Sequence, residues 1–424
     1  MAMFKYSKVD FLFTCLGLVF LVLDIGLDVL AVVSLYQEKE YWSLGVLLLF
    51  LVGSSVLVQA FSWLWYSYEN FKRDTTVEKC VSESQLKLLH VLQLGIYFRH
   101  AGVVEVSIRS FFSKIRGLDE DVAVFLSHDL SMLRLIETFS ESSPQLVLML
   151  ILILQRGQLD AWTVLKAVGS ASAIACSVTM YHRSLRSFLR DKQKQQIVSS
   201  LVYFLWNLLL LMSRITALAL FASVLPCFIF THFFCSWIIL FFFVWRAKTD
   251  FMEGPRGEWL YRATVGLIWY FDWFNVVDGK TRYKTLFYHG YILVDISLLC
   301  GLWCWKMITD PPNFEIPPLG AYITAAGVVG VYMLGLFFKL IYYKFYHPNL
   351  DKTKLKGDDT EMSPTGAFLT IERQSTDVPD FPALRAFSEG LVTDGEERSA
   401  PRPPPTETKR CNKRMKKLAE NFYC

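Results

Sequence analysis

Long apolar runs constrain this sequence more than any other feature. Seven of them are strong candidates for helices that cross a lipid bilayer, for which about 20 residues suffice. They cover residues 11–35, 42–66, 161–181, 200–224, 226–246, 285–307 and 319–345. With 53% hydrophobic and only 19% charged residues, the chain is too apolar for an ordinary soluble domain. The sequence therefore predicts an all-α polytopic membrane protein, and nothing indicates a nucleic-acid partner.

Two further runs, 118–155 and 259–277, mix apolar and charged residues and decide the topology. Basic residues in short loops favour the cytosolic side. If 259–277 crossed the membrane, the basic loop 278–284 would lie outside and the loop 308–318, which has no basic residue, inside. We therefore interpret 259–277 as re-entrant. By the same rule the polar half of 118–155 dips into the membrane before its apolar half crosses, with a break at Ser142, Ser143 and Pro144.

This topology has about eight transmembrane helices, two charged re-entrant or in-plane helices, and both termini in the cytosol. Each half contains two spans, a dipping segment and two more spans, which indicates two pseudo-symmetric halves. The predicted parts are an N-terminal membrane half (1–181), a basic cytosolic loop (182–199), a C-terminal membrane half (200–348), a disordered cytosolic tail (349–408) and a basic amphipathic end (409–424).

Several charged residues lie inside or at the edges of the apolar runs, where each costs at least about 2–3 kcal/mol. They are Asp24, Asp28, Asp129, Arg134, Glu137, Glu141, Arg183, Arg214 and Asp295. Asp24 and Asp28 are one helical turn apart, and the spacing of Arg134, Glu137 and Glu141 places them on one helix face. Two interpretations stay open. The residues line a polar route, or they form internal ion pairs, for example Asp24 or Asp28 with Arg183 or Arg214.

The segment DLSMLRLIETFSESSPQLVL (129–148) resembles the corresponding segment of the XK-related family of membrane proteins. Other strings agree with that family in the same order, among them FSWLWY (61–66), EWLYRATVG (258–266) and FDWFNVVDGKTR (271–282). The resemblance covers residues 5–348 and is strongest for the branch whose members are caspase-activated phospholipid scramblases. It implies exposure of phosphatidylserine at the plasma membrane during apoptosis, and a single-span companion of the basigin or neuroplastin type.

The resemblance also implies that an executioner-type caspase cuts the C-terminal tail. DVPD (377–380) has the Asp-x-x-Asp form, and Asp394 precedes the small residue Gly395, so Asp377, Asp380 and Asp394 are the candidate sites. A cut there would release residues 409–424. We hypothesise that this basic end blocks the route until it is removed, the alternative being a helix that merely binds anionic lipid.

The sequence contains no phosphate-binding loop, zinc-binding helix or catalytic triad, so we expect neither enzymatic activity nor a cofactor nor a metal site. Phospholipids are the expected cargo, with the charged residues as a path for their headgroups. Two other functions remain open. Intramembrane carboxylates and repeats also suit a secondary transporter of a small polar solute, and a scaffold subunit of a membrane complex would need only the ion pairs.

Overall fold

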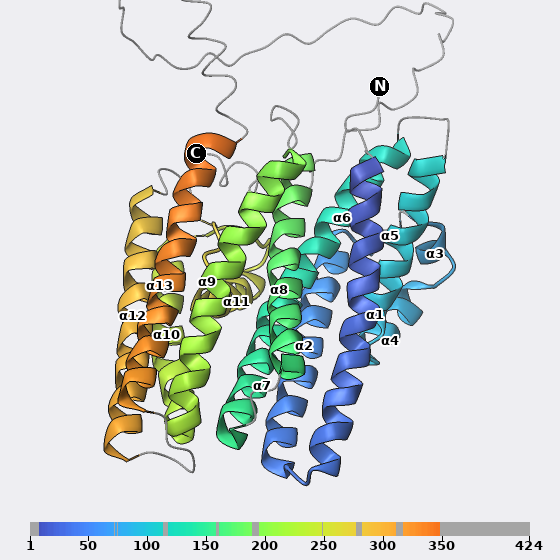
Figure 1. Cartoon of the computed structure of the whole chain (residues 1–424). Helices are drawn as coiled ribbons and strands as arrows, with labels where there is room; N and C mark the ends of the chain where they lie inside the picture. Colours follow the sequence, from blue (N-terminus) through green and yellow to red (C-terminus); the bar gives the residue numbers. More distant parts are fainter. Residues whose placement is uncertain are drawn as a thin grey trace, which may run out of the picture. The chain divides into compact units, whose positions relative to one another are not determined.

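The computed structural model describes residues 8–71, 73, 75–112, 118–157, 161–188, 195–247, 249–276, 282–310 and 317–347. Every regular element in these ranges is a helix (Figure 1). The helices are α1 (Lys8–Gln37), α2 (Tyr41–Tyr68), α3 (Thr76–Lys79), α4 (Glu83–Val91), α5 (Gly95–Phe112), α6 (Leu118–Glu137), the π-helical turn η1 (Thr138–Ser142), α7 (Ser143–Arg156), α8 (Ala161–Phe188), α9 (Ile197–Val224), α10 (Pro226–Arg246), α11 (Pro255–Phe271), α12 (Arg282–Thr309), α13 (Pro318–Ile341) and the π-helical turn η2 (Tyr342–Tyr346).

Eight helical segments are long and apolar enough to cross a membrane. They are Asp10–Gln37, Tyr41–Tyr68, Val122–Arg156, Val164–Arg186, Ile197–Val224, Pro226–Arg246, Tyr283–Thr309 and Pro318–Tyr346. All seven strong candidates from the sequence are among them, and the eighth contains most of the mixed run 118–155. The prediction of an all-α polytopic membrane protein with about eight spans is confirmed.

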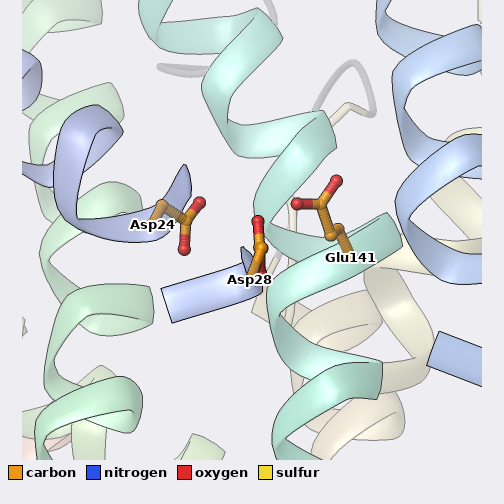
Figure 2. A group of neighbouring side chains, drawn as sticks. All are labelled: Asp24, Asp28 and Glu141. Carbon is orange, nitrogen blue, oxygen red and sulfur yellow. The ribbon is translucent and has the colours of Figure 1, made fainter. Parts of the chain in front are cut away.

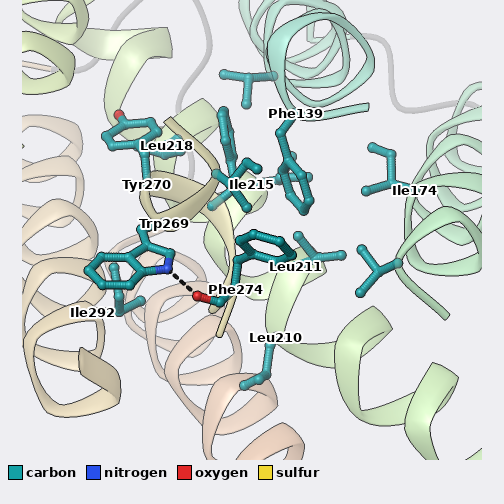
Figure 3. Close-up of a cluster of buried hydrophobic side chains, with 14 of the residues drawn as sticks. Phe139, Ile174, Leu210, Leu211, Ile215, Leu218, Trp269, Tyr270, Phe274 and Ile292 are labelled. Atoms are coloured by element: carbon teal, nitrogen blue, oxygen red, sulfur yellow. Dashed lines mark hydrogen bonds between the residues drawn. The ribbon is translucent and has the colours of Figure 1, made fainter. Parts of the chain in front are cut away.

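Residues 259–271 of the mixed run 259–277 lie in α11, which has 17 residues and is not one of the eight spanning segments. Gly266 lets α11 pack closely on α10, because a Cβ there would lie 3.3 Å from backbone atoms of Phe241. The helix ends inside the bundle, where the Trp269 indole donates a 2.6 Å hydrogen bond to the carbonyl of Phe274 (Figure 3). The chain thus turns back within the core, in agreement with a segment that does not cross.

The predicted break between a dipping and a spanning helix at Ser142–Pro144 is wrong. Helix α6 continues through η1 into α7 without interruption. Pro144 has no N–H to donate into the preceding turn, and a π turn accommodates this. The Ser143 N–H bonds back to the Thr138 carbonyl, and the Ser143 hydroxyl donates to the same carbonyl at 3.0 Å. The whole of Val122–Arg156 is therefore one spanning candidate.

The segment in the first half that does not span consists instead of α3, α4 and α5. Two capping boxes, at Thr75 and Ser82, begin the short helices α3 and α4. Helix α5 packs against α1, α2 and α6 at one side of the bundle (Figure 1). Both halves thus contain two spans, non-spanning helices and two more spans, while the exact domain boundaries stay a prediction.

Helix α9 lies at the centre of the core. It packs against α7, α8, α12 and α13, and 67% of the residues in its most apolar stretch are buried. Figure 3 shows its side chains Leu211 and Ile215 among Phe139 of η1 and Ile174 of α8. The opposite extreme is α1, with only 6% of the corresponding stretch buried. Helix α1 is therefore an outer wall that adheres to the bundle through few apolar contacts.

The predicted disordered tail and basic end, residues 349–424, lie outside the described residues, as do the candidate cleavage sites Asp377, Asp380 and Asp394. Of the predicted basic loop 182–199, residues 182–188 extend α8 and residues 197–199 begin α9.

Candidate functional site

Acidic residues are spread along the whole of α1 and its end. Four of them form what we call the α1 charge series, namely Asp10, Asp24, Asp28 and Glu38. Each lies near a polar or basic group of α6, α7 or α8. At about 1.5 Å per residue, Asp24 is roughly 21 Å along the helix from Asp10, and Glu38 is roughly 15 Å beyond Asp28. The series therefore places polar groups at successive depths along a helix of membrane-spanning length.

Arg134 of α6 joins two of the predicted carboxylates. Its guanidinium donates to Asp24 at 2.9 Å and to Glu137 at 2.8 Å. The sequence correctly placed Arg134 and Glu137 on one helix face, but it proposed Arg183 or Arg214 as examples of partners for Asp24. Arg134 is the ion-pair partner of Asp24 in the described part of the chain. All three side chains are 16–23% exposed, so the ion pairs lie at the edge of the bundle rather than in its core.

Three carboxylates meet where α1 faces η1. Oxygen atoms of Asp24, Asp28 and Glu141 all lie within 4.8 Å of one another (Figure 2). Gln145 of α7 hydrogen-bonds Asp28, and Ser54 of α2 hydrogen-bonds Glu141. Closely spaced carboxylates repel one another unless a proton or a cation lies between them. The cluster is therefore suited to a cation, and the ammonium of a lipid headgroup is one that fits oxygen acceptors.

The π turn η1 accounts for the position of Glu141. A π turn inserts an extra residue into the helix and rotates the residues that follow it. The hydroxyl of Ser140 lies 2.8 Å from both the Ile136 carbonyl and the Ser54 hydroxyl of α2, and this contact fixes the turn against α2. Glu141 consequently lies beside both α1 and α2, which simple helical spacing in the sequence could not show.

Arg183 of α8 lies at the other end of the α1 charge series, beside a cavity of about 110 Å³. Its Nη1 donates to the Gln195 carbonyl at 3.0 Å and to Ser200 at 2.6 Å. The guanidinium also stacks on the Phe13 ring of α1, 4.5 Å from its centroid. Polar or charged residues that line the cavity are Asp10, Thr14, His100, Ser127, Ser131, Arg134, Ser177, Arg183 and Ser184.

Asp129 does not join the α1 charge series. It pairs with Arg99 of α5 at 3.2 Å, and both side chains are almost completely buried. The Arg99 guanidinium also lies 4.1 Å from the ring centroid of Tyr66, whose hydroxyl donates to Glu78. This network connects α5 to α2, α3 and α6 through side chains that include Asp129. Arg99 was not foreseen because its segment lacks a membrane-span signal.

The second half contains a separate charge set. Arg214 of α9 donates to Asp295 of α12 at 2.5 Å and to the Tyr270 carbonyl at 3.0 Å. His232 of α10 contacts Asp295 at 3.1 Å and the Tyr270 hydroxyl at 3.0 Å. Within the described ranges no ion pair connects this set to the α1 charge series. The structure therefore does not unite the nine predicted residues in one site.

The structure adds three polar groups that the sequence had not singled out: Lys339, His289 and His100. Lys339 of α13 contacts His289 of α12 at 2.6 Å, and His289 in turn contacts the Tyr332 hydroxyl at 2.9 Å. Burial raises the pKa of nearby Asp272 to about 7, although Lys339 acts in the opposite direction. Burial lowers the pKa of His100 on α5 to about 4, and Arg134 adds to that effect. Lys339 lies near the end of its apolar run, where a lysine normally indicates only the membrane surface.

The similarity to known proteins extends over the same part of the chain as the helices. The sequence model of a family described as "XK-related protein" matches residues 12–348. A protein named "XK-related protein 8" from Tetraodon nigroviridis is 43% identical over 355 residues, which cover 82% of this chain and 86% of the relative. A protein of the same name from Pan troglodytes is 34% identical over 374 residues, or 87% and 92% of the two chains.

Proposed function

The chain belongs to the XK-related family, and we propose that it is a scramblase that moves phospholipids between the two leaflets of a membrane down their gradient. The observation that carries the proposal is the α1 charge series, which extends polar groups along one spanning helix at the edge of the bundle. No chemical conversion and no cofactor are needed, because the protein only lowers the barrier that the charged headgroup meets.

A phospholipid that changes leaflet must carry its headgroup across about 30 Å of hydrocarbon while its acyl chains stay in lipid. Helix α1 suits this requirement because it has two unlike sides. One side carries the α1 charge series, and the other exposes apolar side chains such as Val22 and Leu23, which are 63% and 54% exposed. Carboxylates can hold the headgroup amine and arginines its phosphate. The arrangement thus supports passage along α1 rather than through a closed pore.

We further propose that transport exposes phosphatidylserine at the plasma membrane during apoptosis. An executioner-type caspase would activate it by cutting the tail at Asp377, Asp380 or Asp394, which releases residues 409–424 from the cytosolic face. A single-span subunit of the basigin or neuroplastin type would deliver the protein to the surface. These steps rest on the resemblance seen in the sequence and on the family membership.

The second charge set favours one competing function. Arg214, Asp295 and His232 lie between α9, α10 and α12, away from the α1 charge series. Enclosed ion pairs of this kind also occur in secondary transporters of small polar solutes. A scaffold subunit would need the same pairs only for stability.

One reconstitution separates these functions. The full chain is inserted into liposomes that contain fluorescently labelled phospholipid, and a membrane-impermeant quencher is added before and after treatment with an executioner caspase. A chain ending at residue 408 serves as the constitutively active control. Scrambling predicts quenching beyond the half that resides in the outer leaflet, and only after cleavage. Uptake of a polar solute without lipid movement would instead indicate a carrier, and neither signal would indicate a scaffold.

A further inference from the structure

The cavity behind α1 lies between four helices near the end of the bundle that we expect to face the cytosol. Its walls come from the first part of α1, the middle of α5 and α6, and the last turns of α8. We propose that this cavity binds a phosphate group, and that a phospholipid supplies it by entering sideways past α1. The inference rests on the proposed function and assigns a substrate group to one particular place on the route.

Two hydrogen-bond donors on the cavity wall find no acceptor within the part of the chain that the structure describes. Arg183 Nε and Ser127 Oγ are both buried from solvent, and neither finds an acceptor among the described residues. Buried polar groups in proteins are nearly always satisfied by protein, water or a ligand. Phe13 covers the face of the Arg183 guanidinium, so its edge is the part left for an acceptor. A group with several oxygens is the chemistry that such an edge recognises best.

The size and the charge of the cavity fit a headgroup but not a whole lipid. Its volume is about 110 Å³, and an engineered protein cavity of about 150 Å³ is large enough for benzene. A phosphate group therefore fits, while the acyl chains must remain outside in lipid. Asp10 lines the same cavity as Arg183. A carboxylate beside an arginine favours a phosphodiester that also carries an amine over inorganic phosphate alone.

Helix α1 provides a lateral entrance because it is weakly attached along this stretch. Of its residues that line the cavity, none belongs to the buried apolar core of the described chain. Gly17 lies on the cavity wall, and a Cβ at that position would meet only the flexible end of Met180, at 3.1 Å. Side chains of α1 that face outward, including Val19, are exposed. A small outward movement of α1 would open the cavity to the hydrocarbon of the adjoining leaflet.

Binding can be measured on the purified full-length protein in detergent, with dihexanoyl phosphatidylserine and inorganic phosphate as separate probes. Arg183→Gln removes the proposed phosphate ligand, and Gly17→Leu fills the cavity without touching that ligand. Gly26→Leu is the matched control, because Gly26 is on the same helix with no heavy atom within 4 Å of an added Cβ. We expect the first two variants to weaken binding of the lipid at least tenfold and the control to leave it unchanged.

Wild-type affinity for both probes in Arg183→Gln and Gly17→Leu would overturn the inference and leave the cavity to water. If Arg183→Gln fails to fold, Gly17→Leu decides. Equal binding of inorganic phosphate and lipid, lost in both variants, would support a phosphate site with a soluble source. If both variants lose binding but still move lipid at the wild-type rate in liposomes, the cavity is not on the route, which refutes this inference and leaves the proposed function standing. If the caspase-treated wild type binds the lipid probe but does not move lipid in liposomes, the proposed function alone is refuted.

Discussion

The centre of the α1 charge series gives the most direct test of a polar route. The perturbation replaces Asp24 and Asp28 by Asn and Glu141 by Gln, which keeps the shapes of the side chains but removes three negative charges. Glu137 remains, but Arg134 neutralises it at 2.8 Å. The remaining acidic positions of α1, Asp10 and Glu38, are roughly 42 Å apart along the helix. That separation exceeds the hydrocarbon core of about 30 Å, so the headgroup amine would cross the core without a carboxylate to hold it.

The size of the effect follows from this gap. A charged group at the bilayer centre costs about 2.5–3.5 kcal/mol on insertion scales. Since about 1.4 kcal/mol corresponds to a factor of ten, loss of the central carboxylates should slow lipid movement roughly 60- to 300-fold. The assay is the quenching of labelled lipid in liposomes, with the tail cleaved in every sample.

Two controls make the result interpretable. Asp310→Asn removes an exposed carboxylate at the end of α12, away from the α1 charge series, and should leave the rate unchanged. Thermal unfolding and gel filtration show whether the triple variant has folded. A folded triple variant that moves lipid at the wild-type rate would refute the reasoning, because the route would then not need these carboxylates. If it does not fold, Asp28→Asn alone is the variant to measure.

The other charged groups predict outcomes of different kinds. Arg99→Met removes the buried Arg99–Asp129 ion pair and should lower the free energy of unfolding by about 3–5 kcal/mol. Denaturant titration measures this loss. Equal losses in Arg99→Met and Arg99→Met/Asp129→Leu would show that loss of the ion pair to Asp129 is not the cause. The pKa of His100 is lowered from 6.5 to about 4 in the folded protein, so the unfolded chain takes up the proton first and stability should fall as the pH drops from about 6.5 towards 4. His100→Gln should flatten that part of a melting-temperature profile, and an unchanged slope would exclude His100. Finally, replacement of Asp377, Asp380 and Asp394 by Ala should abolish activation in apoptotic cells. Undiminished surface phosphatidylserine in that variant would contradict caspase control.

The apolar runs predicted the spanning helices because membrane insertion depends mainly on length and composition, both of which a sequence displays. The distribution of basic residues between short loops located α11 as a segment that does not cross. It failed in the first half for a physical reason. Helix α5 is amphipathic and carries Arg99, whose cost is offset by Asp129 from another helix. A partner that is distant in sequence has no local signal, so the non-spanning segment was assigned to 118–155 instead.

The candidate site, too, could be predicted from the sequence only in part. The four-residue spacing of Asp24 and Asp28 predicted that both lie on one face of their helix, and in the structure both face Glu141. Partner choice was not predictable, because Arg134 and Asp24 are 110 residues apart in sequence. The π turn at 138–142 also changes which face Glu141 occupies. It arises because Pro144 has no N–H to donate and Ser143 bonds back to the Thr138 carbonyl. Sequence spacing assumes a regular helix and therefore misses such a rotation.

Comparison of Arg214 with Arg134 indicates why we propose that the headgroup moves along the first half and not the second. Arg214 is fully buried, and its ion pair with Asp295 has a further contact from His232. A ligand could reach Arg214 only if α9 separated from its neighbours in the core. The Arg134–Asp24 pair joins a wall helix with few apolar contacts to α6, and both side chains keep some exposure. A headgroup can replace each partner in turn, its phosphate on Arg134 and its amine on Asp24, so the number of charge-assisted hydrogen bonds is conserved while α1 moves. An exchange of partners of this kind has a much lower barrier than breaking a buried pair outright.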